Sequence, residues 1–263
     1  MLLRAAILAA AIARVLLSES PSPIPPLQQA LTLFNSGKYQ ECFKVLSPYV
    51  RLNPANAAAH KLLGMDEFML GKAGDALAEV RLATELAPND ADAFYYLGRL
   101  YFSADNSPAA LHAFERAVQL DPSSVRIHNQ LGQTLEALGR EQEAERAYLK
   151  AIELSRDAPK KSEWPFYNLG LLCFHNGRTE EATRYFRQAL DCNPQFPEAK
   201  VKLAVILSKQ GSSREAARLL QEALQSDAAN AEGHYRLGLL LLKNGNSEEA
   251  RREFALFEKY RKR

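Results

Sequence analysis

One pattern repeats along nearly the whole chain and constrains its fold more than any other feature. The dipeptide Leu-Gly recurs in one register at 63/64, 97/98, 131/132, 169/170 and 237/238, and Leu203-Ala204 fills the one missing place. The glycines of these five dipeptides are therefore 34, 34, 38 and 68 residues apart. A fixed period of this length is typical of proteins in which each unit is one hairpin that buries its apolar face against its neighbours. We expect a linear array without a central core.

Proline keeps the same register independently of glycine. It follows a helical pattern at positions 54, 88, 122 and 194, and Ala228 occupies the equivalent place. The step from 122 to 194 is 72, which is two periods plus four residues, so we expect one insertion near residues 157–162. The common register predicts an array over 23–263 with seven units: 23–56, 57–90, 91–124, 125–158, 163–196, 197–230 and 231–263.

The pattern of each unit predicts two helices joined by a short turn. An apolar helical pattern is followed by a turn such as HNGRT and then by a second helical pattern. A glycine at the turn favours a left-handed residue that ends the first helix, and Ser or Thr after it predicts an N-cap for the second. The turn glycines are Gly37, Gly71, Gly139, Gly177, Gly211 and Gly245, and the expected caps are Ser107, Thr179, Ser213 and Ser247.

A known repeat family shows the same signature. The third unit matches all eight signature positions with Phe94, Leu97, Gly98, Tyr101, Ala110, Phe114, Ala117 and Pro122. The fifth unit departs only at Cys173, whereas the first has Pro26, Gln29 and Ala30 at signature positions. The pattern resembles the tetratricopeptide repeat (TPR), as found in bacterial exported or membrane-associated TPR scaffold proteins. The resemblance implies an all-α, right-handed superhelical α-solenoid of stacked hairpins.

The small and large signature residues have complementary roles. Counting from the first residue of each range, positions 8 and 20 carry Gly or Ala in nearly every unit, and positions 4, 11 and 24 often carry aromatics. Small residues let two helix backbones approach, and the aromatics fill the remaining space. Replacing Gly98 or Ala110 by Leu is expected to overpack this contact and to cost about 1–3 kcal/mol.

The cysteines and histidines are expected to be structural. Cys173, His175 and Cys192 lack the four-ligand grouping of structural zinc, and a hairpin places the two cysteines apart, so no metal site is predicted. Cys173 instead occupies a core position. Histidine recurs at position 4, where an aromatic normally packs, in His60, His128 and His234.

The N-terminal segment, residues 1–22, differs from the array. Arg4 precedes an apolar run that Arg14 interrupts, and a Ser/Pro stretch follows. This order resembles a secretory signal or short membrane anchor, although the run is shorter than the ~20 residues that span a bilayer. We expect an exported, periplasmic or extracytoplasmic protein, with membrane association through residues 1–17. The alternatives are a cytoplasmic protein whose first segment is an amphipathic capping helix, or a start codon placed too early.

Charge and motifs limit the classes of function. With 33 basic and 31 acidic residues the net charge is +2, which gives no field for gathering phosphates, so nucleic acid is not expected as a partner. No phosphate loop, dinucleotide fingerprint, metalloprotease motif or nucleophile elbow occurs, so we expect neither a catalytic residue nor a cofactor. The alternatives are a TPR subunit that recruits substrates to an enzyme complex, such as a glycosyltransferase system, and a helical-repeat RNA binder.

Partner binding is the function that the resemblance implies. TPR proteins line a concave groove with positions 2, 5, 9, 12 and 13 of each first helix, and the aromatics and arginines here suit an extended peptide or a helix. Tyr95, Trp164 and Tyr167 are the strongest candidates, whereas the phenylalanines at position 12 are expected to bind or to pack. The predicted groove comprises Lys61, Met65, Tyr95, Arg99, Phe102, Arg126, Asn129, Gln133, Trp164, Tyr167, His175 and Tyr235, and the last repeats add Val201, Val205, Lys209 and Lys243. Phe254, Phe257 and Tyr260 of the terminal repeat suggest self-association.

Overall fold

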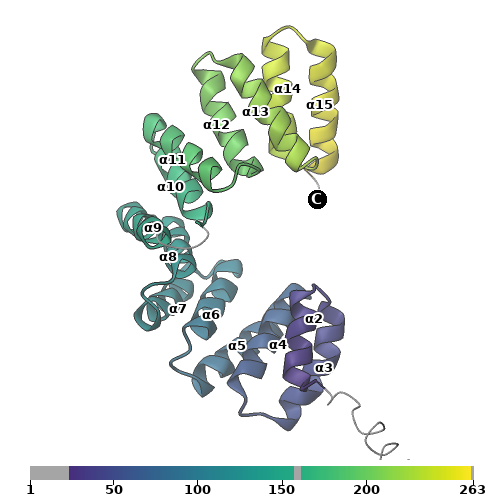
Figure 1. The fold of residues 1–263 in the computed structure, drawn as a ribbon, viewed down its shortest axis with the longest axis vertical. Coiled ribbons are helices and arrows are strands. Elements are labelled where there is room, and N and C mark those ends of the chain that lie inside the picture. The colour runs from purple at the N-terminus through teal and green to yellow at the C-terminus, as the bar shows by residue number, and fades with distance from the viewer. Residues whose placement is uncertain (1–23, 157–160, 262–263) are drawn as a thin grey trace, which may run out of the picture. The chain divides into compact units, whose positions relative to one another are not determined.

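The computed structural model describes residues 24–156 and 161–261, and Figure 1 traces their order along the chain. Within these residues all regular structure is α-helical. The helices are α2 (Pro26–Asn35), α3 (Tyr39–Leu52), α4 (Ala57–Met69), α5 (Ala73–Leu86), α6 (Ala91–Ser103), α7 (Ser107–Leu120), α8 (Val125–Ala137), α9 (Glu141–Ser155), α10 (Trp164–His175), α11 (Thr179–Cys192), α12 (Pro197–Lys209), α13 (Ser213–Ser226), α14 (Ala231–Lys243) and α15 (Ser247–Tyr260).

The chain divides into two compact units, Met1–Asn89 and Asp90–Arg263. In the first unit, α2 packs on α3 and α4 on α5, and α3 and α4 join these two pairs. In the second unit, the pairs α6/α7, α8/α9, α10/α11, α12/α13 and α14/α15 stack in chain order. We call the earlier helix of each pair its first helix; α6 contacts α8, α8 contacts α10, and α12 contacts α14. The predicted all-α architecture of stacked hairpins is confirmed.

The turn inside each pair has a left-handed residue, as the sequence predicts for six of the pairs. Gly37, Gly71, Gly139, Gly177, Gly211 and Gly245 all have φ between 72° and 88°. The third pair has no glycine there, and Asp105 adopts φ 56° instead. Aspartate tolerates this region better than most side chains because its short polar group can bond locally.

The predicted N-caps of the second helices are wrong. Ser107, Thr179, Ser213 and Ser247 are the first residues of α7, α11, α13 and α15, so each lies one residue beyond the cap. Side-chain caps instead occur at Asn106 before α7 and at Asn56, Asp90 and Asn230 before first helices, where a side-chain oxygen accepts a backbone N–H.

Glycine on the first helices α6, α8, α10 and α14 faces an aromatic ring on the second helix of the same pair. A Cβ built on Gly132 would lie 2.5 Å from the ring of Tyr148, and one on Gly98 would lie 2.8 Å from Phe114. Gly170 stands in the same relation to Phe186, at 2.8 Å. The expected contact between small and large residues is confirmed, and these helices could not approach as closely with any side chain in place of glycine.

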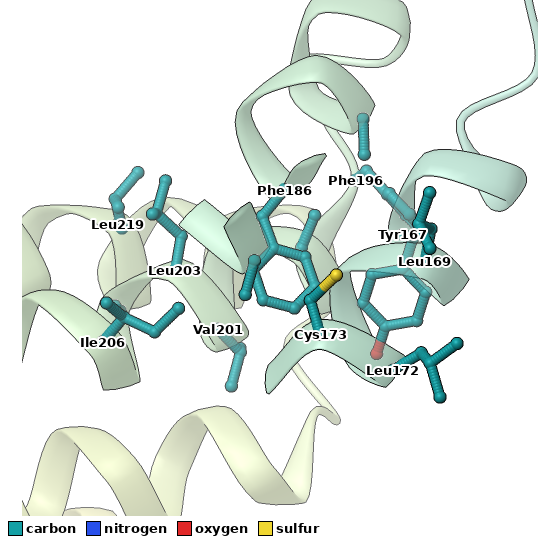
Figure 2. Close-up of a cluster of buried hydrophobic side chains, with 14 of the residues drawn as sticks. Tyr167, Leu169, Leu172, Cys173, Phe186, Phe196, Val201, Leu203, Ile206 and Leu219 are labelled. Atoms are coloured by element: carbon teal, nitrogen blue, oxygen red, sulfur yellow. The ribbon is translucent and has the colours of Figure 1, made fainter. Parts of the chain in front are cut away.

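Cys173 is part of the hydrophobic core. Its side chain is fully buried, and Figure 2 shows its sulfur beside the ring of Phe186. Cys192 lies at the far end of α11 and is only half-buried. The described residues contain no group of three side chains that could hold a metal ion. Cys173 therefore acts as a small apolar residue in the position that an aromatic usually takes.

The recurring histidines link three of the helix pairs to the connection that precedes them. His60, His128 and His234 are 4–8% exposed, and Nε2 of each lies 2.9–3.2 Å from the backbone carbonyl oxygen six residues earlier. Nδ1 of His60 contacts Glu79 at 2.5 Å, and Nδ1 of His234 contacts Glu253 at 2.7 Å. The predicted packing role is confirmed, with hydrogen bonding added to it.

The predicted signal or anchor at residues 1–22 lies outside the described residues. Among the helices that the structure does describe, none combines the length and apolar character needed to cross a bilayer.

Candidate functional site

A cleft of about 480 Å³ opens on the first helices of the second unit. We call it the α6–α8–α10 cleft. Six of the twelve predicted groove residues line it, which shows that positions 2, 5 and 9 of these helices converge on one hollow. The lining residues are Tyr95, Arg99, Val125, Arg126, Asn129, Gln130, Gln133, Ser162 and Trp164.

Tyr95 lies between two arginines. Its ring packs on Phe114 with the centroids 6.0 Å apart, and only 9% of the residue is exposed. The guanidinium carbon of Arg126 lies 4.6 Å from the Tyr95 ring centroid, and that of Arg99 lies 5.9 Å away. Burial raises the pKa of the Tyr95 hydroxyl, and the two arginines offset part of the rise. The ring is a neutral platform that holds cations by their attraction to its face.

The two arginines differ in how their charge is balanced. Arg126 forms an ion pair with Asp92, which lies one turn before Tyr95 on α6. Arg99 is exposed and forms no ion pair with any residue that the structure describes. The cleft therefore presents one uncompensated positive charge at its α6 wall.

Amide side chains form the middle of the cleft. Asn129 is 8% exposed, and its Oδ1 accepts a hydrogen bond of 2.9 Å from Nδ2 of Asn168 on α10. This bond fixes the Asn129 side chain and links α8 to α10. Gln130 and Gln133 are half-buried beside it. Amides of this kind can both donate to and accept from the backbone of an extended peptide.

Trp164 supplies the exposed apolar surface of the cleft. It is 44% exposed, although its ring packs edge-on against Phe196 with the centroids 4.9 Å apart. A tryptophan held by neighbours and still open on one face is the kind of residue that contributes most to protein interfaces.

Not every predicted groove residue reaches this cleft. Tyr167 is 8% exposed and packs between Phe186 and Phe196, so its ring belongs to the core. Val201 is 1% exposed and is also a core residue. Phe102 is half-buried and His175 is exposed, and neither lines the cleft.

The remaining predicted groove residues lie on other helices. Tyr235 is 37% exposed on α14 and packs against Phe257. Lys61 and Met65 lie on α4 in the first unit, where both are half-buried.

Three lining residues were not predicted. Val125 and Gln130 stand at repeat positions 1 and 6, next to the positions that we assigned to the groove. Ser162 lies in the insertion before α10. The four extra residues in the sequence could have predicted this contact, because a longer connection can bring its end residues over the neighbouring helices.

Comparison with known proteins identifies the repeats. One model described as tetratricopeptide repeat matches residues 123–195, and a second of the same description matches 27–91 and 201–258. Together they cover most of the chain. The chain belongs to the tetratricopeptide repeat family. A model of anaphase-promoting complex, cyclosome, subunit 3 also matches residues 78–151.

Two curated relatives illustrate the range of TPR proteins that resemble this one. Photosystem I assembly protein Ycf3 of Cyanophora paradoxa is 39% identical over 79 residues, which are 30% of this chain and 45% of that protein. Type IV pilus assembly protein PilF of Pseudomonas aeruginosa is 28% identical over 154 residues, 58% of this chain and 60% of its own. The chain thus spans about half the length of these relatives.

Solved structures share the fold. The structure of Pseudomonas aeruginosa PilF superposes with a TM-score of 0.68 at 23% identity, covering 79% of this chain and 92% of that one. A TPR protein from Parabacteroides merdae gives 0.69 at 17% identity, covering 89% and 91%. YrrB, described as a TPR protein with an unusual peptide-binding site, gives 0.51 at 21% identity, covering 69% and 91%. At these identities the likeness establishes the TPR fold.

Proposed function

We propose that this TPR protein is a non-catalytic scaffold that binds a peptide or helix of a partner protein in the α6–α8–α10 cleft. The observation that carries the proposal is the convergence of an exposed tryptophan, an uncompensated arginine and a row of amides on one hollow of about 480 Å³. A volume of this size accommodates several side chains of a peptide.

The lining suggests how a peptide is held. Trp164 offers an apolar face for one anchoring side chain, and Gln130 and Gln133 can hydrogen-bond to an extended backbone. Arg99 favours a partner segment with an acidic group close to that anchor. Because Tyr95 and Tyr167 are buried, we assign them to shaping the wall rather than to contacting the partner.

The relatives support the general class of function. YrrB is described as peptide-binding, and PilF and Ycf3 are named as assembly proteins. Assembly and peptide binding both require one protein to hold another, which a TPR array does without a catalytic group.

The proposal is tested by affinity capture with the full chain from the native cell extract, read by quantitative mass spectrometry. The parent is compared with a variant that carries Arg99→Ala and Trp164→Ala, both on exposed side chains. We expect at least one protein to be retained by the parent and reduced on the order of tenfold or more with the variant, as for truncation of interface hot spots.

A matched control carries Arg187→Ala and Leu149→Ala, which remove an exposed cation and an exposed large apolar residue from second helices α11 and α9. Capture should survive this change. Equal capture by the parent and the Arg99/Trp164 variant, with both folded by circular dichroism, would contradict binding in this cleft.

A second candidate is suggested by one relative. The human protein O-mannosyl-transferase TMTC3 is 27% identical over 138 residues, which are 48% of this chain and 15% of that protein. This chain would then recruit substrates to a separate enzyme, and a glycosyltransferase among the captured proteins would favour that role. The N-terminal sequence favours an exported location, which fractionation of cells that express the full chain would test.

A further inference from the structure

A second cleft lies between two first helices at the C-terminal end of the array. It measures about 170 Å³ and is formed by α12 and α14, which pack side by side. Val205, Leu239 and Leu240 contribute its apolar lining. This volume accommodates about one large apolar side chain. We call it the α12–α14 cleft.

An apolar stripe runs beside this cleft along α14. Tyr235, Leu239 and Leu242 are 37%, 40% and 52% exposed, and their spacing of four and three residues places them on one helix face. Leucines so exposed on a packed helix leave apolar area in contact with water, which another helix could remove by packing across them.

The charged side chains that line the cleft all have one sign. Lys209, Arg236 and Lys243 are part of its lining, and no carboxylate is. Lys209 and Lys243 are exposed and form no ion pair with any described residue. They stand at the same repeat position, at the ends of α12 and α14. Favourable interaction with the helix dipoles explains a lysine at each end, but it does not explain the absence of a carboxylate partner.

Arg236 adds a donor that the protein leaves unused. One of its terminal nitrogens lies 3.4 Å from Glu232, but its Nε is buried and has no hydrogen-bond partner in the structure. A buried donor without a hydrogen-bond partner costs free energy.

We propose that the α12–α14 cleft binds an acidic amphipathic helix of a partner protein. The apolar face of that helix lies on Leu239 and Leu242, and its flanking carboxylates face Lys209 and Lys243. The cations specify a negative partner because a basic helix of the same apolar pattern would meet like charge on both sides. The inference rests on the proposed function, in that the chain holds partners by its first helices, but it concerns a separate cleft with its own chemistry.

The test uses two synthetic helices of about 18 residues, long enough to be helical when bound. Both carry leucine on one face, and the flanking positions are glutamate in one probe and lysine in the other. Binding to the full chain is measured by fluorescence anisotropy. We expect the glutamate probe to bind on the order of tenfold more tightly than the lysine probe, because two cations lie beside the apolar stripe.

Charge reversal at the two lysines decides the outcome. The variant Lys209→Glu/Lys243→Glu should reverse the preference between the probes, whereas the matched control Arg187→Glu/Arg214→Glu changes the net charge equally on second helices and should leave the preference within about twofold. Circular dichroism checks folding, and Lys209→Gln/Lys243→Gln provides a milder variant that should abolish the preference. The proposal would be overturned if neither probe bound or if both bound with equal affinity. It would also be overturned if the preference survived the lysine-to-glutamate changes or were lost to the same extent in the Arg187/Arg214 control. Capture through the α6–α8–α10 cleft would remain, so the two proposals fail separately.

Discussion

Two acidic side chains are buried in the first unit, and they should make its stability depend on pH. Asp66 and Glu67 on α4 are 0% and 6% exposed. At the same two repeat positions the third unit has Leu100 and Tyr101. Neither oxygen of Asp66 has a hydrogen-bond partner, and Oε2 of Glu67 has none. Burial raises the pKa of Asp66 from 3.8 to about 6 and that of Glu67 from 4.5 to about 7.

Several charged neighbours modify these values. Glu79, Asp75 and Asp66 raise the pKa of Glu67 further, whereas Lys72 lowers the pKa of both acids. Burial remains the largest cause in both cases, so folding shifts the titration of each acid to higher pH.

The sign of the effect follows from linkage. Both pKa values are higher in the folded than in the unfolded chain, so the protonated groups contribute stability below pH 4, which is lost as pH rises through 6 and 7. Between pH 8 and pH 5 the linkage relation gives on the order of 1 kcal/mol from Asp66 and 2–3 kcal/mol from Glu67. The two acids interact, so the sum is an upper value.

Hydrogen exchange measured by mass spectrometry on peptides within residues 24–89 reports the opening of this unit alone. After correction for the intrinsic exchange rate, its opening free energy should be higher at pH 5 than at pH 8. The variant Asp66→Asn/Glu67→Gln should lose this difference and should be the more protected protein at pH 8. Protection that is independent of pH in the parent, or a dependence that the variant retains, would refute the reasoning. Trp164 fluorescence follows the second unit as an internal reference.

Three further predictions concern packing, backbone and thiols. Gly132→Ala places a methyl group against Tyr148 and should destabilise the second unit by about 1–3 kcal/mol in urea unfolding, whereas Gly74→Ala, with open space around its Cβ, should be neutral or stabilising. Asp105→Gly removes the cost of a left-handed conformation at a residue with a side chain, and it should stabilise the second unit by about 0.5–1 kcal/mol in urea unfolding. A decrease in the free energy of unfolding of the same size would contradict this. Burial raises the pKa of the Cys173 thiol to about 11, so in the folded protein iodoacetamide at pH 8 should label the half-buried Cys192 first, as peptide mapping would show.

Much of the fold follows from residues that repeat. Gly37 and its equivalents predicted the turns because a left-handed position selects glycine, and Gly132 predicted a close contact because only a residue without a side chain fits there. Asp105 was not predicted, because an aspartate can occupy that conformation but does not require it. The caps were misplaced because a serine beside a turn is compatible with either of two adjacent positions, and these signals do not fix the first residue of a helix.

The candidate site was less predictable for a different reason. Repeat position fixes the direction in which a side chain leaves its helix, and Arg99, Arg126 and Trp164, which stand at predicted groove positions, line one hollow. It does not fix which neighbouring rings cover that side chain. Tyr167 leaves α10 at a groove position, yet Phe196, which follows α11, packs against its ring. Burial at such a position depends on the particular residues of the next unit.

The central claim is that a partner lies in the α6–α8–α10 cleft, and photo-crosslinking tests it most directly. A photoreactive phenylalanine analogue replaces Gln133, which lines the cleft, or Arg187, which is exposed on the second helix α11. Each full-length chain is expressed in its native cells and irradiated. We predict a discrete crosslinked protein from position 133 that is absent from position 187 and is lost when Trp164→Ala and Arg99→Ala are added. Identical products from both positions, or none from position 133, would contradict the claim.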